Sequence, residues 1–149
     1  MYKEINELLK LTSNIENETK PLWGTMTSQK MIEHLVNTFR VSSGKIYIQC
    51  FSQAEKLPIL KKILMSDRPM PRGFDSPANK VLPQKYEFEN LDTAIENLRK
   101  EVKDYYKYFE ENPYAKTVNP TFGELEKSEW EQFHKKHLTH HFTQFGLIE

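Results

Sequence analysis

The last stretch of the chain, residues 128–146, constrains the fold most, because it has the pattern of one amphipathic helix and carries four of the five histidines. Ser128 can open this helix and Gly146 can close it, since serine favours helix starts and glycine favours helix ends. His137 and His141 are one turn apart, with Cβ atoms about 5–6 Å from each other. Two imidazoles at this spacing can reach the same metal ion.

A pair of histidines supplies only two ligands, so a metal site needs a third ligand from elsewhere. His34 is the one histidine outside the last stretch, and it falls on another predicted helix. That helix has Thr27 as its N-cap and continues to about residue 43, before Gly44. His34 lies at the edge of the apolar face, where a side chain can face a cleft. The residues alone leave open whether His34 is a ligand or an ordinary surface histidine.

Other side chains share the face of the last helix with His137. A helix turns about 100° per residue, so Trp130 lies about 20° from His137, His134 about 60° to one side and His140 about 60° to the other. Either of these two histidines can replace a ligand or bind a group of a substrate. We interpret His134 as part of the wall around the site and Trp130 as one of its aromatic neighbours.

Apolar residues at helical spacing predict two further long helices and one short one. The first covers residues 3–16, and a later one covers about 91–111 with Asn90 or Asp92 as its cap. The short helix starts near Pro58. No segment has a convincing alternation of polar and apolar residues, so the sequence predicts an all-α fold.

The middle of the chain, residues 44–85, is rich in proline and has few periodic apolar residues. A connection of this length is typical of a bundle in which helices two and three are joined by a crossover. Residues 45–51 can either continue helix two or cross in an extended form. Within the connection, Arg72 can present a cation to an anionic substrate or belong to a plain loop. Cys50 is interpreted as a buried, inert thiol.

Length and charge limit the class of protein. The 149 residues suit a single domain over residues 1–149, and we expect a four-helix bundle with a long crossover. Lys plus Arg and Asp plus Glu both number 21, so neither nucleic acid nor a membrane is an expected partner. The chain has a single cysteine and no signal peptide or run of about 18 apolar residues, which predicts a cytoplasmic protein.

The ending NPTFGELEKSEWEQFHKKHLTHHFTQFG resembles the DinB-like (YfiT-like) superfamily of four-helix metalloproteins. It is most similar to an uncharacterised branch with a Pro-x-Phe-Gly-x-Leu turn and a Lys-His-Leu-x-His-His-x-x-Gln-Phe-Gly close. Upstream, WGTMTSQKMIEHL resembles the helix-two motif of that branch. The resemblance implies a metal site formed by His34, His137 and His141, with Gln144 beside them. Asn119 departs from the branch, which commonly has histidine before the proline.

Three neutral imidazoles leave a divalent ion with open positions, which is typical of a catalytic site. Zinc suits these ligands best, although nickel, iron or manganese would also accept them. His137 is followed by Leu138, so the His-Glu-x-x-His arrangement of metalloproteases is absent. The resemblance implies a thiol S-transferase that uses a low-molecular-weight thiol, or a metal-assisted hydrolase or isomerase, acting on a small molecule.

Two other hypotheses stay open at this point. In one, the protein is a non-catalytic metal-binding stress-response module, and the ion mainly fastens two helices together. In the other, the histidines bind no metal and an aromatic rim binds a partner. No general base is identified, because Glu33 is predicted on the polar side of its helix, whereas Glu129 and Glu131 lie where they favour the helix dipole. Bundles of this superfamily often form dimers, and the residues leave open whether this chain forms a homodimer.

Overall fold

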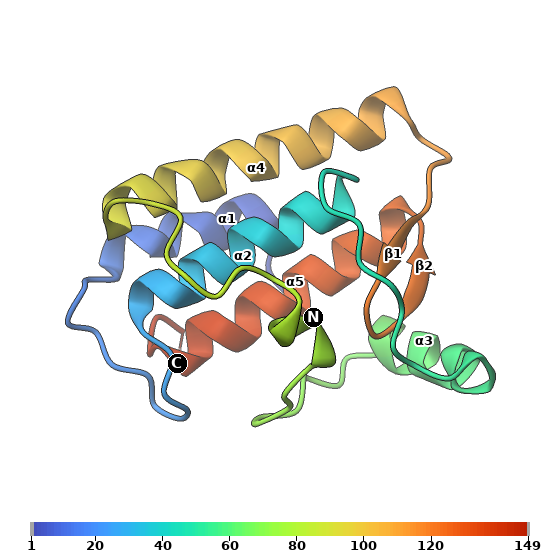
Figure 1. Ribbon diagram of the computed structural model, residues 1–149, viewed down its shortest axis with the longest axis horizontal. Helices are drawn as coiled ribbons and strands as arrows, with labels where there is room; N and C mark the ends of the chain where they lie inside the picture. Colours follow the sequence, from blue (N-terminus) through green and yellow to red (C-terminus); the bar gives the residue numbers. More distant parts are fainter. Residues whose placement is uncertain (1, 149) are drawn as a thin grey trace.

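The computed structural model describes residues 2–148 and shows a mostly helical chain with one small sheet (Figure 1). The regular elements are α1 (Ile5–Leu9), α2 (Ser28–Ser42), α3 (Leu57–Met65), α4 (Leu91–Glu111), β1 (Thr117–Asn119), β2 (Gly123–Leu125) and α5 (Lys127–Gln144). Short 3-10 helices occur at Lys10–Asn14, Ala54–Lys56 and Pro77–Lys80. The prediction of a mostly helical fold is confirmed, and the sheet is an addition to it.

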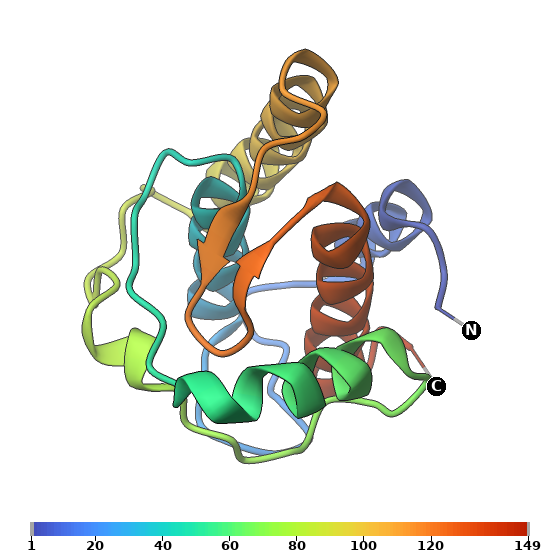
Figure 2. The same cartoon turned by 90° about the vertical axis from the view of Figure 1, so that its right-hand side faces the viewer.

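The helices α2 and α5 lie at the centre of the molecule. α4 runs along α2, and α2 also contacts α5 (Figure 1). α1 packs against α5, and in the end-on view α3 crosses beneath α5 (Figure 2). The β1–β2 hairpin contacts α2 through β1 and α5 through β2. The two helices that carry all five histidines are therefore enclosed by the other elements.

Two helix starts follow the predicted capping. The hydroxyl of Thr27 accepts a hydrogen bond from the backbone N–H of Lys30 at 3.1 Å, which caps α2. The side-chain oxygen of Asn90 accepts from the backbone N–H of Thr93 at 2.8 Å, which caps α4. Both starts are confirmed, and so is the short helix near Pro58.

The start of α5 differs from the prediction. Glu126, rather than Ser128, is the N-cap, because Glu126 and Glu129 form a capping box in which each carboxylate accepts a backbone N–H of the other residue. The hydroxyl of Ser128 instead donates to the carboxylate of Glu126. The end is as predicted: after Gln144 the chain leaves the helix through Gly146, which has a φ of 73°.

The first predicted helix, residues 3–16, is shorter in the structure. After Leu9 the α-helix tightens into a 3-10 helix, and two hydroxyl groups bond to carbonyl oxygens three residues earlier. Thr12 donates to Leu9 at 2.7 Å, and Ser13 donates to Lys10 at 3.0 Å. Side-chain bonds of this kind compete with the regular α-helical pattern, which explains the early end.

The expectation that the chain has no strand is wrong for residues 117–125. There β1 and β2 pair antiparallel, with Thr117 opposite Leu125. Asn119 is buried at the turn, where its side-chain oxygen accepts the backbone N–H groups of Thr121 and Phe122. Strands of three residues are too short to show alternation. Asn119, the residue that departs from the branch pattern, therefore has a structural role in the hairpin.

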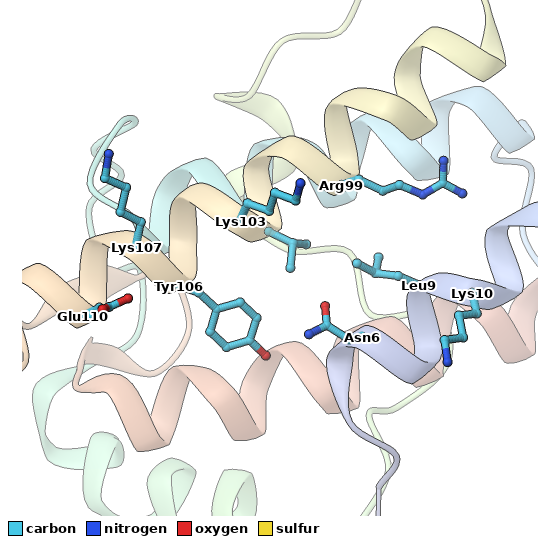
Figure 3. A pocket seen from close by; sticks show the side chains of 9 residues that line it. Asn6, Leu9, Lys10, Arg99, Lys103, Tyr106, Lys107 and Glu110 are labelled. Atoms are coloured by element: carbon cyan, nitrogen blue, oxygen red, sulfur yellow. The ribbon is translucent and has the colours of Figure 1, made fainter.

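A groove of about 520 Å³ lies between α1 and α4 (Figure 3). Its apolar residues include Leu9 and Val102, and Arg99 and Lys103 are among its charged residues. No histidine lines this groove. It is therefore separate from the histidine cluster described below.

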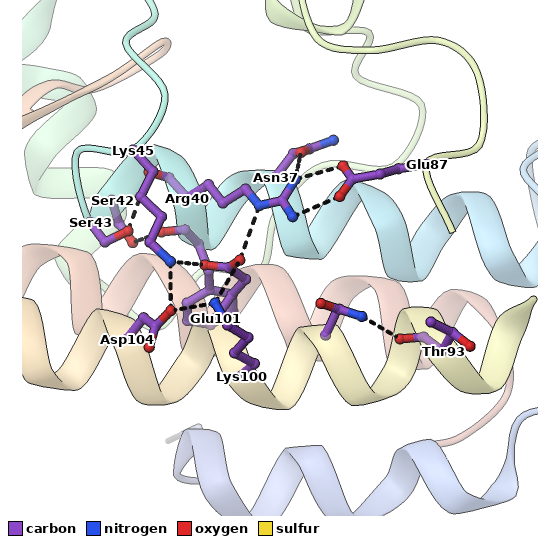
Figure 4. A network of polar contacts seen from close by, with 12 residues as sticks. Asn37, Arg40, Ser42, Ser43, Lys45, Glu87, Thr93, Lys100, Glu101 and Asp104 are labelled. Carbon is purple, nitrogen blue, oxygen red and sulfur yellow. Dashed lines mark hydrogen bonds and ion pairs between the residues drawn. The ribbon is translucent and has the colours of Figure 1, made fainter. Parts of the chain in front are cut away.

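Ion pairs fasten the end of α2 to α4 on another face (Figure 4). The buried carboxylate of Glu101 accepts from Arg40 at 3.1 Å and from Lys45 at 2.7 Å. Arg40 also donates two hydrogen bonds to Glu87, and Lys45 donates one to Asp104. A buried carboxylate with two cationic partners keeps its charge compensated. The network thus joins α2, α4 and the connection that precedes α4.

A long, mostly irregular connection that contains the short helix α3 joins α2 to α4, as the sequence predicts. Residues 45–53 cross without helical structure, so the extended alternative holds for this segment. The last part returns along α2, where the ammonium group of Lys30 donates to the backbone oxygens of Pro83 and Gln84. Among residues 2–148, no helix combines the length and the apolar character needed to cross a membrane.

Candidate metal centre

His137 and His141 project from the same side of α5, as their spacing predicts. Both are buried, with only 8% and 7% of their surface exposed. The two Nε2 atoms are 3.1 Å apart. Phe133, one turn before His137 on the same helix, contacts this face, with its ring 5.1 Å from that of His137. The i, i+4 pair therefore presents two ring nitrogens at one point inside the protein.

His34 joins this pair from α2, although it is 103 residues from His137 in the chain. Its Nε2 atom is 3.0 Å from the Nε2 atom of His137. One nitrogen from each of the three rings lies within 4.8 Å of the other two. His34 is half-buried, as expected for a residue at the edge of an apolar face. The structure thus brings together the three histidines that the resemblance implies.

The three imidazoles are neutral at pH 7. Burial lowers the pKa of His34 to about 4 and that of His141 to about 3, because an apolar environment disfavours the charged form. Burial also lowers the pKa of His137 well below its ordinary value of 6.5. For His34 the next cause is the positive charge of Lys30, one helical turn earlier. Neutral rings keep a lone pair available for a cation.

Gln144 determines which nitrogen of His141 is free. Its side-chain oxygen lies 2.8 Å from Nδ1 of His141, and its amide nitrogen donates to the backbone oxygen of Trp23 at 3.0 Å. The second bond orients the amide so that its oxygen faces the imidazole, and Nδ1 is then the protonated nitrogen. Nε2 of His141 is left without a proton and points toward His137. This is the arrangement that a metal-binding histidine needs.

The distances fit a shared divalent ion. Two nitrogens bound at about 2.0–2.1 Å, with an angle of about 90–110° between the bonds, are about 2.9–3.4 Å apart. The distances of 3.0 and 3.1 Å from His137 to His34 and His141 fall in this range. Without an ion, Nε2 of His137 carries at most one proton and cannot donate to both neighbours. A cation would satisfy all three nitrogens at once.

His134 and Trp130 are packed in the core and are not among the three histidines whose nitrogens converge. The ring of His134 stacks on Phe39 with centroids 3.7 Å apart, and its Nε2 lies 2.9 Å from the hydroxyl oxygen of Ser42. The indole of Trp130 also stacks on the imidazole of His134, with ring centroids 5.3 Å apart. Both residues are completely buried. His134 is therefore committed to packing between α2 and α5 and does not replace one of the three histidines.

His140 lies at the outer side of the cluster, with its ring 5.0 Å from that of His141. The ring of His140 also contacts the ring of Trp23, with ring centroids 5.6 Å apart. Burial and the charge of Arg72 lower the pKa of His140, and the backbone of Met70 offsets part of this shift. The guanidinium carbon of Arg72 lies 3.9 Å from the centroid of Trp23. Arg72, which the sequence offered either as a cation for an anionic substrate or as part of a plain loop, thus contacts Trp23 beside the histidines.

Glu33 is buried, so its predicted place on the polar side of α2 is wrong. Its carboxylate accepts the backbone N–H groups of Glu87 at 2.7 Å and Phe88 at 3.2 Å, and also the side-chain amide of Gln29 at 2.9 Å. These bonds hold the connection that precedes α4 against α2. Glu33 directly precedes His34 in α2, but it is not one of the side chains that could together hold a metal ion.

Lys30 is a charged residue near the cluster that the sequence did not single out. Its spacing of four residues before His34 places it on the same side of α2, and this was the available signal. A hollow of about 370 Å³ lies here, one helical turn from His34. It is lined by Thr25, Met26, Thr27, Lys30 and Tyr86.

Comparison with known proteins identifies one family. A sequence model described as "Protein of unknown function (DUF1569)" matches residues 2–146. No curated protein and no solved structure matches the chain. The matched region contains every residue of the histidine cluster.

Proposed function

The chain belongs to the DUF1569 family, and we propose that it is a divalent-metal-dependent enzyme acting on a small molecule. The observation that carries this proposal is the convergence of one nitrogen each from His34, His137 and His141. Histidine ligands alone, with no thiolate to close the site, are typical of catalytic rather than structural zinc. Zinc is the ion we favour, and nickel, iron or manganese are the alternatives.

We infer that the fold is a four-helix bundle of the DinB-like (YfiT-like) type. The four helices of such a bundle would be α1, α2, α4 and α5, with the crossover between α2 and α4. The position of the histidines on the second and last of these helices supports the inference, together with the sequence motifs at both ends of the chain. This superfamily assignment is what suggests thiol chemistry.

The reaction we propose is transfer of a low-molecular-weight thiol to an electrophile, with metal-assisted hydrolysis as the second possibility. A bound divalent ion supplies Lewis acidity and an open position that favours a thiolate or hydroxide over its protonated form. The chain contributes neutral imidazoles, a fixed tautomer at His141 through Gln144, and apolar surroundings. Glu33 offers no general base, because both carboxylate oxygens accept backbone N–H groups.

The alternative is a non-catalytic stress-response module in which the ion fastens α2 to α5. This alternative is supported by the position of the histidines, since two come from α5 and one from α2. An ion between them would join segments that are far apart in sequence, which stabilises the folded chain by its binding free energy.

One experiment separates the two functions. Protein stripped of metal and then reloaded with zinc, nickel, iron or manganese is mixed with simple thiols and an aromatic electrophile, and in parallel with an activated ester. We expect metal-dependent turnover in one of the two assays, reduced in His137→Ala to the rate of the stripped protein. If stripping lowers the melting temperature but no ion supports turnover, the stress-response alternative replaces the enzyme.

A further inference from the structure

The three-histidine cluster has no negative charge beside it. Among residues 2–148, the cluster of possible metal ligands consists of histidines alone. The carboxylate that directly precedes His34 in the sequence, that of Glu33, is occupied by the backbone N–H groups of Glu87 and Phe88. A divalent ion held by neutral imidazoles keeps its full positive charge in a partly buried place. Such a charge is stabilised most by an anionic ligand.

Two cations add to this positive charge. The charge of Lys30 acts on His34, and the charge of Arg72 acts on His140, which lies next to His141. The ammonium group of Lys30 is already bound to the backbone oxygens of Pro83 and Gln84. Within the described part of the chain, no carboxylate lies at ion-pair distance from Arg72. Of the two cations, Arg72 is the one whose N–H groups stay available.

Contacts with the site hold Arg72 in place. Its guanidinium lies over the ring of Trp23, at 3.9 Å from the centroid, and a cation is attracted to the face of an indole. The backbone oxygen of Trp23 accepts from Gln144, which in turn binds His141. The backbone of Met70, two residues before Arg72 in the same loop, also lies close enough to His140 to offset part of the lowering of its pKa. Arg72 is thus connected to the metal-binding histidines through Trp23 and Gln144.

We propose that Arg72, stacked on Trp23, binds a carboxylate of the substrate beside the three-histidine site. The substrate is then a small molecule with two binding groups, a donor atom for the ion and a carboxylate for Arg72. A guanidinium binds a planar carboxylate through two parallel N–H bonds, a geometry that stacking on an aromatic ring leaves available. This inference rests on the proposed metal-dependent function and adds the charge of the substrate to it.

Thiol binding to the cobalt-loaded protein tests the proposal, because cobalt reports its ligands by its visible absorption. The probes are 3-mercaptopropionate, which carries a carboxylate, and 2-mercaptoethanol, which does not. We expect the wild type to bind 3-mercaptopropionate roughly tenfold more tightly, as a charge-assisted hydrogen bond provides. In Arg72→Gln this preference is expected to disappear while the cobalt content stays the same. Arg68→Gln, at an exposed arginine of the same connection, is the matched control and should retain the preference.

Fluorescence quenching tests the same residue without any metal. Trp130 is completely buried, so quenching by solutes reports mainly on Trp23. In metal-free protein, iodide should quench the wild type more efficiently than neutral acrylamide does, because Arg72 attracts the anion to the indole. The ratio of the two efficiencies should fall at least about twofold in Arg72→Gln and stay unchanged in Arg68→Gln.

The outcomes separate this inference from the function on which it rests. A thiol preference that survives in Arg72→Gln, or an iodide response that is equal in the wild type and Arg72→Gln, overturns the role of Arg72. A protein that takes up no cobalt refutes the proposed metal-dependent function instead. In that case the iodide measurement alone decides whether Arg72 forms an anion site.

Discussion

At the scale of single residues, Gln144 links the histidines to the rest of the protein. It accepts the Nδ1 proton of His141 and donates to the backbone of Trp23, so its two bonds set both the tautomer and the ring orientation. The resemblance implied that Gln144 lies beside the metal site, but only the structure reveals its second partner. That partner is 121 residues away in the chain, beyond what a local pattern can indicate.

We predict that Gln144→Leu lowers the affinity for a divalent ion about 10- to 100-fold, the usual loss when the partner of a ligating histidine is removed. Without the side-chain oxygen of Gln144, either ring nitrogen of His141 can carry the proton, so Nε2 is no longer kept free for the ion. Gln132→Leu is the matched control, because Gln132 lies on the same helix and its amide donates to Ser66 away from the cluster. Titration against a chelator of known affinity measures the effect. Equal affinities for the two variants would show that Gln144 does not orient His141.

Glu33 illustrates how a charged residue can be misread from its helix position. Helical periodicity places it on the polar side of α2, yet the returning crossover covers that side and supplies two backbone N–H groups. Those partners, Glu87 and Phe88, lie more than 50 residues away. No sequence pattern announces which part of a long connection returns to a helix.

For Glu33→Ala we predict a loss of about 2–4 kcal/mol in the free energy of unfolding, because the partly buried N–H groups of Glu87 and Phe88 lose their acceptor. Glu33→Gln keeps one acceptor oxygen and should lose less. Urea unfolding of the metal-free variants measures both values. A loss below 1 kcal/mol for the alanine variant would mean that water replaces the carboxylate at no cost.

At the scale of elements, the turn at residues 22–24 closes one side of the cluster. Leu22 donates its backbone N–H to the backbone oxygen of Gln144 at 2.7 Å, so both ends of Gln144 bind this turn. Gly24 has a φ of 78°, and a Cβ atom there would lie 3.2 Å from the side-chain nitrogen of Gln144. Glycine is thus required both by the backbone and by the close approach.

We predict that Gly24→Ala reduces the free energy of unfolding by about 1–2 kcal/mol and weakens metal binding about tenfold. The control is Gly73→Ala, because Gly73 has nearly the same φ, 77°, with no atom within 4 Å of an added Cβ. It should lose similar stability with unchanged metal affinity. If both alanine variants bind metal alike, the contact with Gln144 has no influence on the site.

The sequence predicted the elements whose signals are local. Helices α2 and α4 follow apolar periodicity and begin at Thr27 and Asn90, whose side chains cap them. The hairpin of β1 and β2 escaped prediction, because strands of three residues are too short to show a period. The shift in the start of α5 has a similar cause: Glu126 is an uncommon N-cap, and only its partnership with Glu129 makes it one.

The candidate site was predictable in part. The pair His137 and His141 follows from helix geometry alone, and the sequence supplied His34 as the remaining histidine. Helix periodicity could not show that His34 reaches the pair, because that depends on how α2 packs beside α5. The same limit explains His134: its angle on the helix allowed a place near the cluster, but its neighbour Phe39 from α2 holds it in the core.

At the scale of the whole molecule, four histidines are held neutral by folding. Burial lowers the pKa of His134 and His137 well below 6.5, and it brings those of His34 and His141 to about 4 and 3. The unfolded chain therefore binds more protons than the folded chain as the pH falls below about 6.5. The contribution of these neutral histidines to the free energy of unfolding of the metal-free protein is fully present above that pH and is lost on acidification.

His134→Phe should make the free energy of unfolding depend less steeply on pH. The slope should fall by the contribution of one proton, about 1.4 kcal/mol per pH unit. His134 suits the test because it lies in the core rather than in the metal-binding cluster, and phenylalanine can keep the stacking on Phe39. Urea unfolding of metal-free protein between pH 5 and 7.5 gives the slope for each variant. A slope identical to that of the wild type would mean that His134 is already protonated or exposed in the folded state.

The central claim concerns the whole chain, because the proposed ion joins the second helix to the last. Elemental analysis of protein purified without a histidine tag tests it most directly. We predict about one divalent ion per chain in the wild type and in His134→Phe, and essentially none in His137→Ala or His141→Ala. Metal content that is absent from the wild type, or unchanged in both alanine variants, would contradict the three-histidine site.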